Sequence, residues 1–144
     1  MRLRNHTNIP AGAIRAMVRF VVPSGVAGFD VRVSNLGGSG VRGRAYHHGC
    51  SLHDRACPFV VVSVQRKGHL APWTPTRGGY LPMPAMTREE GVLFVLAHEL
   101  RHMWQSKVKH GRRVYGARGQ FSERDADAYA LRALRHWRRG EAMP

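Results

Sequence analysis

Two histidines and a glutamate in the second half of the chain have the spacing of a metal site. They occur in the sequence His98-Glu99-Leu100-Arg101-His102. On a helix, residues four apart lie on one face, so both imidazoles can bind a single zinc ion. Glu99 lies about 100° around the helix from His98, so its carboxylate can act as a general base without becoming a ligand.

A second acidic cluster supplies the remaining partners that such a site needs. Catalytic zinc usually takes three protein ligands and keeps its fourth position for water. Glu123, 21 residues after His102, is the candidate third ligand. Asp127 lies one helical turn further on, where it can accept the free ring N–H of a zinc-bound histidine. The alternative without a metal is that His98 and His102 are buried structural histidines and Glu99 pairs with an arginine.

The two clusters together resemble the gluzincin metallopeptidases, whose pattern is H-E-x-x-H followed by E-x-x-x-D. The resemblance covers residues 98–131, and upstream of it only the order of elements agrees with the smallest members, the minigluzincins. It implies a zinc-dependent metalloendopeptidase with a peptide or protein substrate. It further implies that His98, His102 and Glu123 bind zinc, that Glu99 activates water, and that Asp127 supports a histidine ligand.

Two neighbouring families differ from this pattern in their spacing. Metzincins would need glycine at position 105 and histidine or aspartate at position 108, where this chain has Gln105 and Val108. The SprT-like metallopeptidases use a downstream histidine in place of the glutamate, and they often act near DNA. His110 and His136 are therefore alternative third ligands, and Asp125 is a further substitute.

The predicted reaction is the hydrolysis of a peptide bond by a metal-activated water. Zinc lowers the pKa of its bound water to about 7, Glu99 takes the proton, and the hydroxide attacks a carbonyl that the metal polarises. A second electrophile should stabilise the oxyanion. The candidates are Tyr115, His110, Tyr129 and Arg132; the spacing selects none of them, and Tyr115 is taken as the working choice.

The elements around these residues predict a single α+β domain over residues 1–144 with a small three-stranded sheet, and the resemblance implies that its fold is zincin-like. Thr87 and Glu90 form a capping box ahead of a long apolar run, which marks the start of the helix that carries the motif. Strand 59–64 resembles the zincin edge strand that pairs with substrate, although an ordinary core strand fits it equally well. The expected elements are a helix from about Pro10 to Pro23, strands 29–36, 41–48 and 59–64, the motif helix from Thr87 to 106–109, and a last helix from an N-cap at Ser122 to about Arg139.

A cysteine and histidine cluster at 47–57 has three interpretations. Cys50 and Cys57, with a neighbouring histidine, could hold a second, structural zinc, although their spacing matches no standard zinc finger. A local disulfide and two free thiols are the other interpretations.

The composition adds a second class of function. The formal net charge is +14, and 20 of the 23 basic residues are arginines. Such a charge favours weak association with nucleic acid, so the rival hypothesis is a basic DNA-associated protein that keeps a zinc site without turnover. No apolar run approaches the roughly 18 residues that span a bilayer, so we expect a cytoplasmic protein without a membrane anchor.

Overall fold

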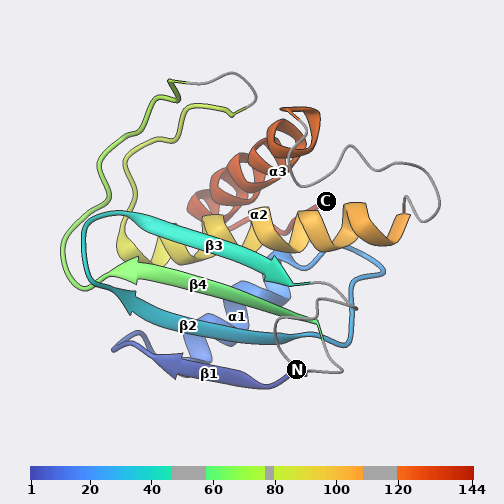
Figure 1. Cartoon of the computed structure of the whole chain (residues 1–144), viewed down its shortest axis with the longest axis horizontal. Helices are drawn as coiled ribbons and strands as arrows, with labels where there is room; N and C mark the ends of the chain where they lie inside the picture. Colours follow the sequence, from blue (N-terminus) through green and yellow to red (C-terminus); the bar gives the residue numbers. More distant parts are fainter. Residues whose placement is uncertain (47–57, 77–79, 109–119) are drawn as a thin grey trace.

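The computed structural model describes residues 1–46, 58–76, 80–108 and 120–144, which form a sheet and three helices (Figure 1). Cys50, Cys57, His110 and Tyr115 lie outside the described residues. The elements in chain order are β1 (Leu3–His6), α1 (Ala11–Val21), β2 (Asp30–Leu36), β3 (Val41–Tyr46), β4 (Phe59–Gln65), α2 (Arg88–Val108) and α3 (Gln120–Arg139).

The sheet has four strands in the order β1-β2-β4-β3, so the prediction of three strands was wrong. The missed strand is β1, which pairs in parallel with β2. Asn5 occupies an inward position of β1, level with Val33, and its side-chain amide donates to the carbonyl of Ile9 at 2.7 Å. A polar residue that serves the following turn therefore replaces the apolar one that would have revealed the alternation.

The pairing around β4 also differs from expectation. β4 lies between β2, to which it is parallel, and β3, to which it is antiparallel. The interpretation of strand 59–64 as the edge strand was therefore wrong, because β3 is the edge. β4 has the pattern of an interior strand, in which Val60, Val62 and Val64 are fully buried.

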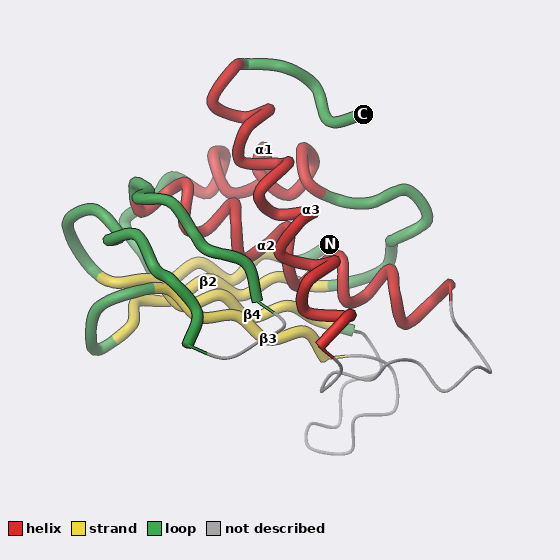
Figure 2. Tube along the Cα trace, turned by 90° about the horizontal axis from the view of Figure 1, so that it is seen from above, coloured by secondary structure: helices red, strands yellow, loops and turns green. Residues whose placement is uncertain are grey.

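The three helices of the described residues all cover one face of the sheet, and none of them lies on the other face (Figure 2). The valines of β2 and β4 meet the apolar side of α2, where Leu93, Leu96 and Leu100 are fully buried. α2 also packs against α1 and α3, which explains why its apolar residues are distributed around the helix. None of the described helices is both long enough and apolar enough to cross a membrane.

The two ends of α2 and α3 that lie away from the motif are tied together. Thr87 and Glu90 form the predicted capping box, with Thr87 N–H on Glu90 Oε2 at 2.8 Å and Glu90 N–H on Thr87 Oγ1 at 3.1 Å. The same carboxylate accepts two hydrogen bonds from Arg138 of α3, at 2.8 and 2.9 Å. The predicted N-cap at Ser122 was wrong, because α3 begins at Gln120.

Candidate metal centre

His98, His102 and Glu123 form a group that could hold a metal ion. The Nε2 atoms of the two histidines are 3.0 Å apart, and Oε2 of Glu123 lies 3.3 Å from His98 Nε2 and 3.6 Å from His102 Nε2. A tetrahedral zinc ion with bonds of 2.0–2.1 Å requires its ligand atoms to be about 3.3 Å apart. The three atoms therefore have the chemical type and the spacing of three zinc ligands.

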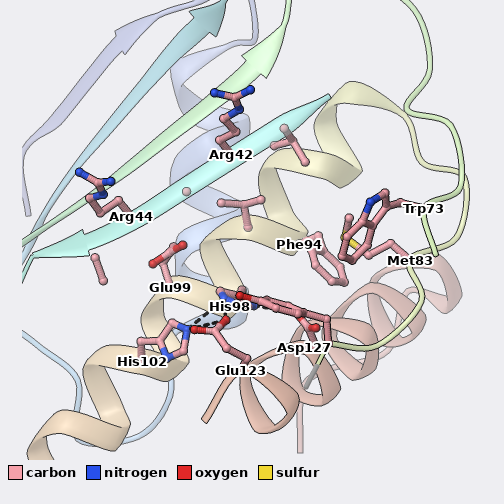
Figure 3. Close-up of a pocket in the computed structure, with 15 residues that line it drawn as sticks. Arg42, Arg44, Trp73, Met83, Phe94, His98, Glu99, His102, Glu123 and Asp127 are labelled. Atoms are coloured by element: carbon pink, nitrogen blue, oxygen red, sulfur yellow. Dashed lines mark hydrogen bonds and ion pairs between the residues drawn. The ribbon is translucent and has the colours of Figure 1, made fainter. Parts of the chain in front are cut away.

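Two helices bring this group together. Both histidines belong to α2 and point toward α3, from which Glu123 reaches back to them (Figure 3). Ala126, Ala130 and Ala133 of α3 are fully buried, and these small side chains permit a close approach of the helices. The predicted i, i+4 geometry and the predicted third residue are thus found in one place.

His98 is oriented by Asp127, the residue that the sequence indicated for this role. Asp127 Oδ1 lies 2.9 Å from His98 Nδ1, on the side of the ring opposite to Glu123. Asp127 is buried. Its other oxygen accepts the backbone N–H of Leu81 at 2.9 Å. This single carboxylate therefore fixes the imidazole and also one segment of the chain beside the site.

His102 has a comparable support that the sequence analysis missed. Its Nδ1 lies 2.9 Å from Oε1 of Gln105, which is buried. Gln105 Nε2 in turn donates to Asp125 at 2.7 Å, and Arg101 donates two hydrogen bonds to the same carboxylate at 2.7 and 3.1 Å. Gln105 was noted only as a mismatch to the metzincin spacing. Its position three residues after a histidine ligand, on the same helix face, was the available signal.

The charges within the group are mutually dependent. Burial disfavours the charged form of His98, but its hydrogen bonds with Asp127 and Glu123 outweigh this and raise its pKa to about 9. Burial likewise disfavours the ionised form of Glu123, and the two imidazoles outweigh it and lower its pKa to about 2. The site thus favours an ionised carboxylate beside positive charge, which suits a cation at this point.

Glu99 points in a different direction, toward β3 and not toward α3 (Figure 3). Burial raises the pKa of its carboxyl group, and the hydrogen bond from the backbone N–H of Ala45 opposes that rise. Gly43 lies next to it. A Cβ atom placed on Gly43 would come within 2.6 Å of Glu99 Oε1 and would clash with Val95 Cγ1, so only glycine fits here without displacing these side chains.

The backbone of β3 presents a free edge to the same space. Gln65 N–H donates to the carbonyl of Gly40, so these two residues are a hydrogen-bonded pair of the β3–β4 ladder. Hydrogen-bonded and non-hydrogen-bonded pairs alternate along an antiparallel ladder. The backbone groups of Arg42 and Arg44 therefore face β4, whereas those of Val41, Gly43 and Ala45 face outward. Among the described strands, none pairs with this outer side of β3.

A cavity of about 520 Å³ joins the free edge of β3 to the metal group. His98, Glu99, His102 and Glu123 line one end of it. Beyond His98 the wall becomes apolar, and Figure 3 shows Trp73, Met83 and Phe94 gathered there. The segment carrying Trp73 and Met83 is held by paired backbone hydrogen bonds between these two residues, at 3.0 and 2.8 Å.

The other sequence candidates lie elsewhere. Asp125 is engaged by Arg101 and Gln105 and is not part of the metal group. His136 lies 3.1 Å from the carboxylate of Glu141 near the end of α3.

Tyr129 donates its hydroxyl to the carbonyl of Val21 at 2.9 Å, and with Arg132 it lines a different depression. Tyr115 and His110 are outside the described residues, so the residue that faces an oxyanion stays a prediction.

Comparisons with protein-family models, with curated proteins and with solved structures give no match to this chain.

Proposed function

We propose that this chain is a zinc-dependent metalloendopeptidase of the gluzincin type with a zincin-like fold. The observation that carries the proposal is the placement of three ligand atoms, a separately held glutamate and a free strand edge around one cavity. A structural pair of buried histidines would explain the imidazoles alone. It would not explain why Glu99 is buried beside them with a glycine opposite it.

The division of roles follows from the directions of the side chains. His98, His102 and Glu123 would hold the ion, and zinc when bound supplies a Lewis acid and a water whose pKa is about 7. Glu99 stays off the ligand set because it points toward β3. Its carboxylate is fixed by Ala45 N–H, so it can accept a proton at one oxygen and deliver it to the leaving amine.

The shape of the cavity supports an extended peptide as substrate. The outward backbone groups of Val41 and Gly43 and the carbonyl of Ala45 can pair with a peptide that lies along β3 as an additional strand, while Ala45 N–H stays on Glu99. The apolar wall formed by Trp73, Met83 and Phe94 can then accept an apolar or aromatic side chain beside the scissile bond. Location in the cytoplasm and the identity of the substrate stay predictions.

The proposal is tested by separating metal binding from turnover at Glu99. In Glu99→Gln the side chain keeps its shape but can no longer accept the proton. We expect cleavage of casein by the zinc-loaded protein to fall to background while the zinc content stays at one ion per chain. Glu89→Gln is the matched control, because Glu89 is an exposed glutamate on the same helix and should leave both quantities unchanged.

Equal casein cleavage by Glu99→Gln and the unsubstituted protein would refute the peptidase assignment. Full zinc content with no cleavage by any of the three proteins would favour the rival hypothesis of a zinc-binding protein without turnover.

A further inference from the structure

The face of the sheet opposite the helices carries a group of exposed arginines, here called the arginine face: Arg4, Arg32, Arg42 and Arg44. The strand register places them together. Arg4 of β1 is level with Arg32 of β2, which is level with Val61 of β4 and, through it, with Arg44 of β3. With neighbouring strands about 4.8 Å apart, this row is about 14 Å long.

A second row lies two residues along the strands. It contains His6, Ser34, Ser63 and Arg42, again on the side of the sheet opposite to the described helices. The hydroxyls of Ser34 and Ser63 are hydrogen-bonded to each other at 3.0 Å. Hydroxyl and guanidinium groups are among the side-chain groups that contact phosphate oxygens.

Among the residues that the structure describes, few carboxylates lie on the side of the arginine face. Like charges directly opposite one another on neighbouring strands destabilise a sheet, and Arg4 and Arg32 form such a pair. Asp30 is the one acidic residue of the described strands on this side, and it accepts the backbone N–H of Arg2 at 2.7 Å. The other described carboxylates belong to α2, α3 or the C-terminal segment, beyond the covered face. The arginines therefore create a positive potential over a sheet face that none of the described helices covers (Figure 2).

An aromatic pair borders the arginines on the same face. Tyr46 of β3 is level with Phe59 of β4, and their rings are stacked with centroids 4.3 Å apart and an interplanar angle of 12°. The guanidinium of Arg44 lies 5.9 Å from the centre of the Tyr46 ring. A positive sheet surface with half-buried aromatic rings at its margin is the combination that single-stranded nucleic acids bind, through phosphates and stacked bases.

We propose that the arginine face binds single-stranded nucleic acid, with guanidinium groups on the phosphates and the aromatic pair beside the bases. The arginine side chains lie on the opposite face of the sheet from the metal centre, although Arg42 and Arg44 of the edge strand also border its cavity. The proposal does not depend on the proposed peptidase function. A duplex fits less well, because its stacked bases offer no face to an aromatic ring.

The test measures the affinity for a fluorescent oligodeoxythymidylate about 16 nucleotides long by anisotropy at several salt concentrations. One variant replaces Arg4, Arg32 and Arg42 by glutamine. Loss of three phosphate contacts should weaken binding more than tenfold at low salt. It should also reduce the slope of log affinity against log salt by about 2, since each contact to a single strand contributes about 0.7.

The control variant replaces three exposed arginines of the helical layer by glutamine and has the same net charge. These residues are Arg15, Arg19 and Arg135. We expect the control to bind within about threefold of the unsubstituted protein, because screening at about 10 Å makes distant charges weak. Circular dichroism of both variants verifies that they are folded.

Several results would overturn the proposal. These are equal weakening by the two variants, absence of binding at low salt, duplex binding as tight as that of the single strand, or equally effective competition by polyglutamate.

Discussion

The two sides of α2 hold the candidate catalytic residues in different ways. On the side that faces α3, side chains orient side chains, so that Asp127 fixes His98 and Gln105 fixes His102. On the side that faces β3, Glu99 is held by a backbone N–H and by the missing side chain of Gly43. The first side should govern metal affinity, and the second should govern turnover. Substitutions on each side should therefore separate these two properties.

The largest effect is expected from the proposed ligand that α3 contributes. Glu123→Ala removes one of three ligand atoms, so zinc affinity should fall by more than the roughly 100-fold that loss of a supporting residue can cause. Affinity is measured by competition with a chromophoric chelator, and folding by circular dichroism. Glu89→Ala is the control. Full zinc occupancy in folded Glu123→Ala would exclude Glu123 as a ligand and direct attention to His110.

On the β3 side, Gly43→Ala should impair turnover and spare the metal. The added methyl group would displace the Glu99 carboxylate, and a displacement of about 1 Å can reduce the rate up to 100-fold. Overpacking should also lower the free energy of unfolding by about 1–3 kcal/mol. Peptidase assays at saturating zinc and urea denaturation measure the two effects.

Gly12→Ala is the matched control for this substitution, since no atom lies within 4 Å of a Cβ at Gly12. Unchanged kcat in Gly43→Ala would show that β3 does not position Glu99.

The residues that support the histidines should have an intermediate effect. Asp127→Asn keeps the size of the side chain but removes its charge, and zinc affinity should fall about 10- to 100-fold. Asp125→Asn should lower zinc affinity by a smaller factor, because Asp125 contacts His102 only through Gln105. Isothermal titration calorimetry of both variants with zinc shows which substitution lowers the affinity more. A larger loss in Asp125→Asn would contradict the direct role given to Asp127.

The smallest effect concerns the stability of the metal-free protein as a function of pH. The pKa of His98 is raised from 6.5 to about 9. Its contribution to the free energy of unfolding is therefore complete below pH 6.5 and is lost as the pH rises through 9. The pKa of Glu123 is lowered from 4.5 to about 2, so its contribution is present above pH 4.5 and is lost as the pH falls through 2. Their combined stabilisation is greatest between pH 4.5 and 6.5.

Urea denaturation with a chelator present, at about pH 5.5 and about pH 9.5, measures this difference. The midpoint should be lower at the higher pH, and Glu123→Gln should reduce the difference. A midpoint that is unchanged or higher at the alkaline pH would contradict the ion pairing of His98.

The same contrast explains what the sequence could predict. On the α3 side, the i, i+4 spacing indicated His98 and His102. The need for a third ligand and the resemblance to the E-x-x-x-D pattern indicated Glu123 and Asp127, and the structure brings all four side chains together. The capping box at Thr87 was likewise indicated by residue spacing. Gln105 was missed although it lies three residues after His102, because it was considered only as a mismatch to the metzincin spacing.

The β3 side could not be predicted in this way. The role of Gly43 depends on which strand lies at the edge, and the strand order is not encoded in the local pattern of any strand. The strand 59–64 showed its interior position by its apolar run, but an edge interpretation fitted the same residues. β1 was missed because Asn5 takes an inward position and bonds to the next turn.

The carboxylate of Asp127 links two equilibria that are usually considered separately. One oxygen orients a ligand of the metal group, and the other holds Leu81, 46 residues away in sequence and on the segment that leads to the apolar wall. Linkage between two such contacts is reciprocal. If metal binding stabilises the position of the Leu81 segment, it should raise the affinity for a peptide that contacts this segment. The peptide must then raise the affinity for the metal by the same factor. Chelation and substrate release would then favour each other.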